Sequence, residues 1–145
     1  MTDPNLAILK PVVVLVAWTL VMLVWLLVTR IPAMKAAGVD FGTLIGGKGT
    51  DADGVLPAKA QWKAHNHNHL MEQPTLFYAT AITLALIGQG GGINAEIAWA
   101  YVGFRVLHSL VQATWNRVAV RFTLFLLASL ALVALTLHAG IALFG

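Results

Sequence analysis

The feature that most constrains this chain is an uncharged apolar run near its beginning. Residues 11–29, PVVVLVAWTLVMLVWLLVT, contain no Asp, Glu, Lys or Arg. At about 1.5 Å per residue in a helix, the run matches a hydrocarbon core about 30 Å thick. A secretory signal has a shorter apolar region followed by a small-residue cleavage site, and neither is visible here. The run therefore predicts a retained transmembrane helix.

The composition of the chain indicates the same class of protein. Of its 145 residues, 59% are hydrophobic and 10% are charged, whereas about 25% are charged in typical soluble domains. The absence of Cys excludes disulfides, thiolate metal sites and a cysteine nucleophile. The basic residues are few and spread over two connections, which argues against nucleic acid as a partner. We therefore expect an integral membrane protein that is surrounded by membrane lipid.

Three further apolar segments predict an all-α fold, an integral membrane four-helix bundle. The expected helices cover about residues 8–30, 62–88, 93–116 and 119–144, within a single membrane domain of residues 1–145. GQGGG at positions 88–92 predicts a flexible turn. Residues 31–61, with GGKGTDADG at their centre, predict a long and mobile cytoplasmic loop.

The distribution of Lys and Arg predicts the orientation in the membrane. The basic residues in or beside the first and third connections are Arg30, Lys35, Lys48, Lys59, Lys63, Arg117 and Arg121. The N-terminal segment has only Lys10, and the second connection and the C-terminal end have none. Because cytoplasmic loops carry the excess of positive charge, both termini are expected outside the cytoplasm. The net charge of +3 adds some attraction to anionic lipid.

A polar stretch, HNHNHLMEQP at residues 65–74, opens the second expected helix. Helical geometry of about 100° per residue separates its side chains into faces. One stripe contains His65, Asn68, His69 and Glu72. His67 points to the opposite side, and Asn66 and Gln73 lie on a flank. Pro74 is expected to kink the helix, because it removes its own hydrogen bond to the carbonyl of Leu70.

The third expected helix carries a second polar stripe. Its members are Tyr101, Arg105, His108, Ser109, Gln112 and Asn116. Glu72 and His108 both lie about 13 Å from the cytoplasmic helix ends, and Arg105 about 4 to 5 Å deeper. Ionisable groups at such depth are costly unless paired or hydrated, so the stripes predict a polar cavity open to the cytoplasm, with Glu72 and Arg105 as a buried pair. A solvated helix start and a purely structural clamp between helices remain open as alternatives.

The histidines admit other interpretations. His65 and His69 have the i, i+4 spacing of a shared metal ion, and Glu72 could add a carboxylate. His67 would be left out of such a site, and we expect no bound metal. His138 stands alone in the last expected helix and is interpreted as an interface residue or a hydrogen-bonded packing residue.

Two motifs resemble a known family. HLMEQPTLFYA at residues 69–79 and AYVGFRVLHSLVQATWNRVAVRF at residues 100–122 are similar to the short bacterial branch of the membrane-associated proteins in eicosanoid and glutathione metabolism, the MAPEG family. The resemblance covers about residues 10–143. It implies a homotrimer of four-helix subunits in the bacterial cytoplasmic (inner) membrane. It also implies that glutathione binds between neighbouring subunits near the cytoplasmic side.

The resemblance assigns roles by position. Glu72 matches the family's glutamate on the second helix, Arg105 and His108 match its Arg-x-x-His element, and Arg121 matches the catalytic arginine that activates the glutathione thiol in some members. The sequence departs from the enzymes at four positions. Lys63 alone represents the arginines that grip the glutathione carboxylates, Asn66 stands where a second basic group would be, Gln112 replaces a tyrosine, and Pro74 is closer to Glu72.

Two classes of function remain open. The resemblance implies a glutathione-dependent transferase or peroxidase that acts on lipophilic electrophiles, with Arg121 stabilising the thiolate. The expected ligand-binding residues are Lys63, His65, Asn68, His69, Glu72, Arg105, His108, Gln112 and Asn116. The alternative is a non-enzymatic membrane scaffold, a lipid-binding protein or an accessory subunit of a larger membrane complex. The sequence names neither a substrate nor a partner protein.

Overall fold

The structure is a computed structural model that describes residues 3–145, all of them helical or in turns and loops. The α-helices are α1 (Leu9–Ala36), α2 (Ala58–Met71), α3 (Pro74–Leu86), α4 (Gly92–Thr114) and α5 (Val118–Phe144). Two short 3-10 turns, η1 (Pro4–Leu6) and η2 (Gly49–Ala52), precede α1 and α2. The all-α prediction is therefore confirmed.

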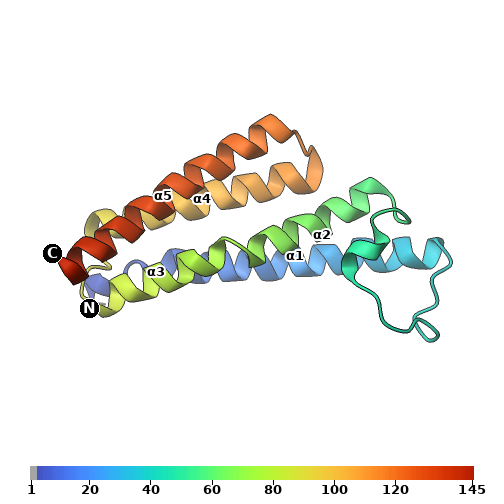
Figure 1. Cartoon of the computed structure of the whole chain (residues 1–145), viewed down its shortest axis with the longest axis horizontal. Helices are drawn as coiled ribbons and strands as arrows, with labels where there is room; N and C mark the ends of the chain where they lie inside the picture. The colour runs from blue at the N-terminus through green and yellow to red at the C-terminus, as the bar shows by residue number, and fades with distance from the viewer. Residues whose placement is uncertain (1–2) are drawn as a thin grey trace.

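The helices form four rods, because α2 and α3 follow each other end to end (Figure 1). This broken rod runs along α1, while α4 and α5 form a long antiparallel hairpin. Both termini and the turn between α3 and α4 lie at one end, and the loop after α1 and the turn between α4 and α5 lie at the other. Two helices, Pro4–Ala36 and Val118–Phe144, are long and apolar enough to cross a membrane.

The second rod is not the single helix that the sequence predicts for residues 62–88. Glu72 closes α2 with φ −89° and ψ −97°, and α3 starts at Pro74. Proline has no N–H to donate to the carbonyl of Leu70, and its ring would collide with that carbonyl in a continuous helix. The expected kink at Pro74 is confirmed, and it amounts to a complete break.

The first connection is shorter than the expected loop of residues 31–61. α1 continues through Pro32 to Ala36, helped by the good helix formers in AMKA that follow the proline. α2 starts at Ala58, directly after Pro57. Residues 37–57 therefore make the connection, and η2 gives part of it regular structure.

The interior contains an apolar and a polar half. In the apolar half, the rings of Phe77 and Tyr101 stack with centroids 4.3 Å apart, and small residues such as Ala81 and Ala98 allow the helices to approach. The predicted stripe of α4 is also buried: Tyr101 belongs to the apolar half, and the polar half contains Arg105, His108, Ser109 and Gln112. Asn116 falls outside α4, in the following turn.

Two contacts hold the end of the bundle at the termini. His138 Nδ1 lies 2.5 Å from Oδ1 of Asn94, which confirms His138 as a hydrogen-bonded packing residue. Gly90 accepts a hydrogen bond from the backbone N–H of Ile8 at 3.0 Å. A Cβ on Gly90 would overlap the carbonyl oxygen of Asn5. The turn between α3 and α4 is therefore held against η1 by a contact that only glycine permits.

Candidate functional site

A cavity of about 260 Å³ lies where α2, α4 and α5 meet. Its lining residues are His69, His108, Val118, Arg121, Phe122 and Phe125. The ring centroids of His69 and His108 are 5.6 Å apart, and Phe125 lies 6.5 and 6.4 Å from them. One arginine and two imidazoles therefore share a small space with an aromatic wall.

Arg105 is the most deeply placed charged group next to this cavity, with no exposed surface. Its Nη2 donates a hydrogen bond to the backbone carbonyl of His69 at 3.0 Å. That carbonyl is in the last turn of α2, where it also accepts a 3.4 Å hydrogen bond from the backbone N–H of Glu72 in place of the usual i+4 partner. The C-terminal end of a helix also carries partial negative charge. The end of α2 therefore supplies the electrostatic partner of Arg105.

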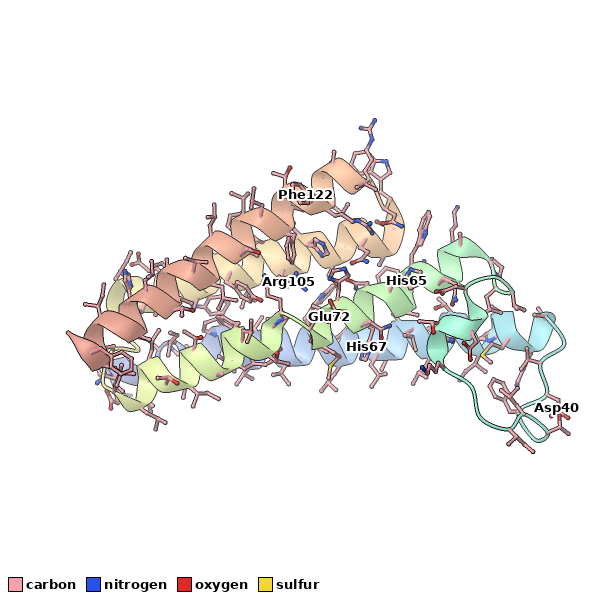
Figure 2. All side chains as sticks on the ribbon, viewed as in Figure 1. Asp40, His65, His67, Glu72, Arg105 and Phe122 are labelled. Atoms are coloured by element: carbon pink, nitrogen blue, oxygen red, sulfur yellow. The ribbon has the colours of Figure 1, made fainter. Side chains whose placement is uncertain are left out.

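The predicted buried pair of Glu72 and Arg105 is consequently wrong for the single chain. Glu72 follows the last residue of α2, and its side chain is 67% exposed. Its carboxylate lies 3.7 Å from Nδ1 of His69. Figure 2 labels Arg105 on α4 and Glu72 just after the end of α2, on neighbouring rods. The carboxylate therefore stays beside His69 on the predicted stripe, but this end of the stripe faces outward and not toward Arg105.

Several buried polar atoms of α2 and α4 have no hydrogen-bond partner among residues 3–145. They are Nε and Nη1 of Arg105, Nδ1 of His108, Oδ1 of Asn66 and Oε1 of Gln112. Buried donors and acceptors are costly when unpaired. The atoms include both donors and acceptors, so this region is suited to a polar ligand or to water.

Asn66 is a contact that helical-wheel reasoning missed. The wheel places it on a flank, yet it is fully buried and its Nδ2 donates to Oγ of Ser109 at 2.6 Å. Asn68, which the wheel places on the polar stripe, is exposed. The difference arises because α4 packs against the flank of α2, and a wheel does not contain the direction of the neighbouring helix.

Replacing Asn66 by Ala is expected to destabilise the protein by about 1 to 3 kcal/mol, because Ser109 loses its buried partner. The matched replacement Asn68→Ala changes an exposed side chain and is expected to stay within about 0.5 kcal/mol. Denaturant unfolding in mild detergent measures both. Equal losses in the two variants would contradict the assignment of the Asn66–Ser109 bond.

Three of the predicted ligand-binding residues do not line this cavity. Nζ of Lys63 lies 5.5 Å over the ring of Trp25 on α1. Nε2 of His65 contacts Oδ1 of Asp53 at 2.9 Å, which ties α2 to the first connection. Asn68 is exposed. His65 and His67 leave α2 in different directions, as the helical angles predict (Figure 2).

Arg121 is positioned by the turn between α4 and α5. Its Nη1 donates to Oδ1 of Asn116 at 2.8 Å. Asn116 has φ 52°, a left-handed conformation that Asn tolerates better than most residues. The other arginine of this turn, Arg117, lies 5.1 Å over the ring of Trp115 and does not line the cavity.

The apolar wall of the cavity was also missed by the sequence reasoning. Phe125 is four residues after Arg121, so the two lie on the same face of α5. That four-residue spacing was the one feature of the sequence that could have indicated Phe125 as a neighbour of Arg121. A uniformly apolar helix, however, does not show which of its faces meets a cavity.

The histidines are distributed over separate contacts. His65 faces Asp53, whereas His69 faces His108. Within residues 3–145, no group of three His, Cys, Asp or Glu side chains could hold a metal ion.

Comparison with known proteins gives one match. The model of the MAPEG family matches residues 8–141, which is nearly the whole chain. No curated protein matches the chain, and no solved structure matches it.

Proposed function

Because this chain belongs to the MAPEG family, we propose that it is a membrane enzyme that adds glutathione to lipophilic electrophiles. The observation that carries this proposal is the cavity in which Arg121, His69 and His108 lie beside an aromatic wall. A cation next to a thiol favours the thiolate, which is the nucleophilic form. The apolar residues beside it suit a substrate that dissolves in lipid.

The residues of the single chain fit part of glutathione. When bound, glutathione supplies the nucleophilic thiol, and it also carries carboxylates that need basic partners. Arg121 lines the cavity and would stabilise the thiolate. Arg105 has two donor nitrogens, Nε and Nη1, without a partner among residues 3–145, and would hold one carboxylate through charge-assisted hydrogen bonds. Lys63, bound over Trp25, is directed to another part of the chain.

A neighbouring copy would complete the site, so we also propose the homotrimer that the family resemblance implies. Glu72 supports it, because an exposed carboxylate about 13 Å inside the bilayer would be costly against lipid. A second chain packed on the end of α2 would cover this group. The proposed assembly lies in a bacterial inner membrane with both termini outside the cytoplasm.

Replacing Glu72 by Gln is expected to weaken the trimer, because the neutral amide loses the charge-assisted contacts that the covering chain would offer. We expect the protein concentration at the dissociation midpoint to rise about threefold, because a loss of roughly 1.4 kcal/mol raises the dissociation constant of a trimer about tenfold and the midpoint follows its square root. Native mass spectrometry or sedimentation in mild detergent measures it. Glu96→Gln, at the exposed glutamate of α4, is the control. An unchanged midpoint in Glu72→Gln would contradict the covered position of Glu72.

Calorimetric titration of the detergent-solubilised trimer with glutathione tests the proposed activity most directly. We expect saturable binding together with turnover of a lipophilic electrophile. Binding without turnover would indicate a ligand-binding protein. A stable trimer that does not bind glutathione would favour the alternative class, a membrane scaffold or accessory subunit of a larger membrane complex.

A further inference from the structure

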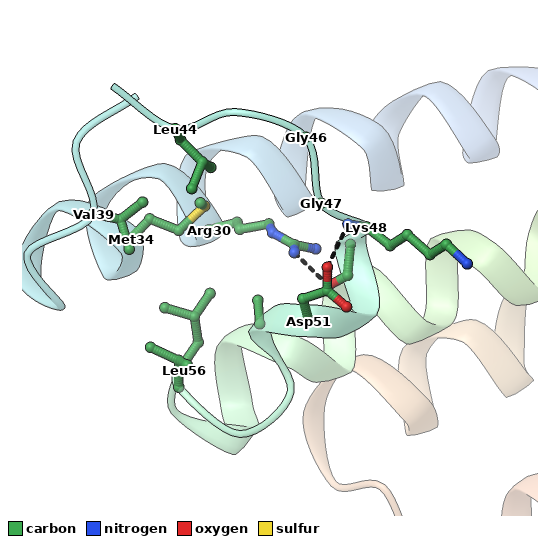
Figure 3. Close-up of a pocket in the computed structure, with 12 residues that line it drawn as sticks. Arg30, Met34, Val39, Leu44, Gly46, Gly47, Lys48, Asp51 and Leu56 are labelled. Carbon is green, nitrogen blue, oxygen red and sulfur yellow. Dashed lines mark hydrogen bonds between the residues drawn. The ribbon is translucent and has the colours of Figure 1, made fainter. Parts of the chain in front are cut away.

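A second pocket lies outside the bundle, at the end of α1, and the proposed glutathione chemistry does not use it (Figure 3). Its volume is about 340 Å³, within the range of about 300 to 1,000 Å³ that is typical of small-molecule sites. The side chains that make its apolar walls are Met34, Val39, Leu44, Ala52, Val55 and Leu56. Arg30, Lys48 and Asp51 form its polar rim together with the backbone of Gly46, Gly47 and Gly49.

The rim of this pocket carries an arginine that no carboxylate of residues 3–145 pairs with. Nη2 of Arg30 donates to the carbonyl of Gly49 at 2.6 Å, and Oδ2 of Asp51 accepts from the backbone N–H of Lys48 at 2.6 Å. Within residues 3–145, neither Arg30 nor Lys48 forms an ion pair. In Figure 3 the Lys48 side chain extends away from the apolar walls, so the Arg30 guanidinium is the unpaired cation that a negatively charged ligand group could reach.

The position of the pocket selects the kind of ligand. Arg30 directly follows the uncharged run 11–29, so it lies at the level of the lipid headgroups. Met34 is one helical turn farther from that run, and Figure 3 shows Met34, Val39 and Leu56 together, away from the Arg30 guanidinium. The apolar walls are therefore outside the bilayer. The acyl chains of a phospholipid that stays in the membrane point into the bilayer, away from these walls, so such a lipid would not fill the pocket.

We propose that this pocket binds a single-chain anionic amphiphile, a long-chain carboxylate that leaves the adjacent leaflet. The carboxylate pairs with Arg30, and the alkyl chain lies against Met34, Val39, Leu44 and Leu56. The volume and the unpaired Arg30 guanidinium both suit one chain with one acidic group. This site is separate from the cavity at Arg121, and its occupancy does not depend on glutathione.

Binding of radiolabelled palmitate to the protein in phosphatidylcholine nanodiscs tests the proposal. We expect saturable binding of one palmitate per chain. Arg30→Gln is expected to weaken it about tenfold, the effect of losing one charge-assisted hydrogen bond, whereas Lys35→Gln, an exposed cation on the same helix, leaves it unchanged. Methyl palmitate should compete poorly because it lacks the charge, and butyrate because it lacks the chain.

Arg30→Gln also removes the hydrogen bond to Gly49, so it could weaken binding by disturbing the loop. A second pair of variants, which leaves that hydrogen bond intact, separates the two effects. Leu44 lines the pocket, while its neighbour Ile45 does not and is 96% exposed. Leu44→Gln is expected to weaken palmitate binding severalfold, and Ile45→Gln to leave it unchanged. Equal binding in Leu44→Gln and Ile45→Gln, equal competition by methyl palmitate, or displacement of palmitate by nanodiscs of phosphatidylglycerol would each overturn the proposal.

Discussion

The variant Arg121→Ala is expected to lose thiolate formation from added glutathione and to conjugate lipophilic electrophiles about 10²- to 10³-fold more slowly, the effect of removing one preorganised donor from a developing anion. The guanidinium is the cation that lines the cavity with His69 and His108. Asn116 holds it in place through a 2.8 Å hydrogen bond. Ultraviolet absorbance of the thiolate and turnover of a lipophilic electrophile measure the two effects.

Arg117→Ala is the matched control for this prediction. Arg117 is in the same turn and has the same charge, but it lies over Trp115 and outside the cavity. His69→Ala and His67→Ala form a second pair, since only His69 lines the cavity. We expect His69→Ala to form less thiolate, and His67→Ala to form almost as much as the original protein. Equal losses in Arg121→Ala and Arg117→Ala would indicate a general effect of surface charge and would contradict the role of Arg121.

The variant Gly90→Ala is expected to lose about 3 kcal/mol of stability or more, because a Cβ cannot be accommodated without moving backbone. The added atom would meet the carbonyl oxygen of Asn5 and the Cγ2 of Ile8. Relief of this overlap would separate η1 from the turn between α3 and α4. It would also break the hydrogen bond from Ile8 to Gly90. Denaturant unfolding in mild detergent measures the loss.

Gly140→Ala provides the control, since a Cβ at that position of α5 has no atom of another element within 4 Å. Alanine is a better helix former than glycine by about 1 kcal/mol, so this variant should be as stable as the original protein or slightly more stable. A stable Gly90→Ala protein would mean that η1 can leave the bundle without cost.

Physical regularities that act along the chain were enough to derive most of the fold. The uncharged run 11–29, the glycine-rich turn before α4 and the 3.6-residue periodicity determine where helices form and which face of α4 is buried. Arg105 and His108 could be identified in the same way, because ionisable groups are rarely placed inside apolar helices without a partner.

The partners of these groups depended on the tertiary structure. Helix α2 ends before Glu72, and the carboxylate of Glu72 is exposed beside His69 and is not paired with Arg105. Asn66, on the flank of α2, makes the hydrogen bond to α4, whereas Asn68 on the predicted stripe is exposed, because α4 packs against that flank. A helical wheel describes angles about one axis, whereas hydrogen bonds between helices depend on the separation and rotation of two axes. The sequence by itself therefore determined the helices and the polar groups they carry, and only the packing of α2, α4 and α5 decided which of those groups share the cavity.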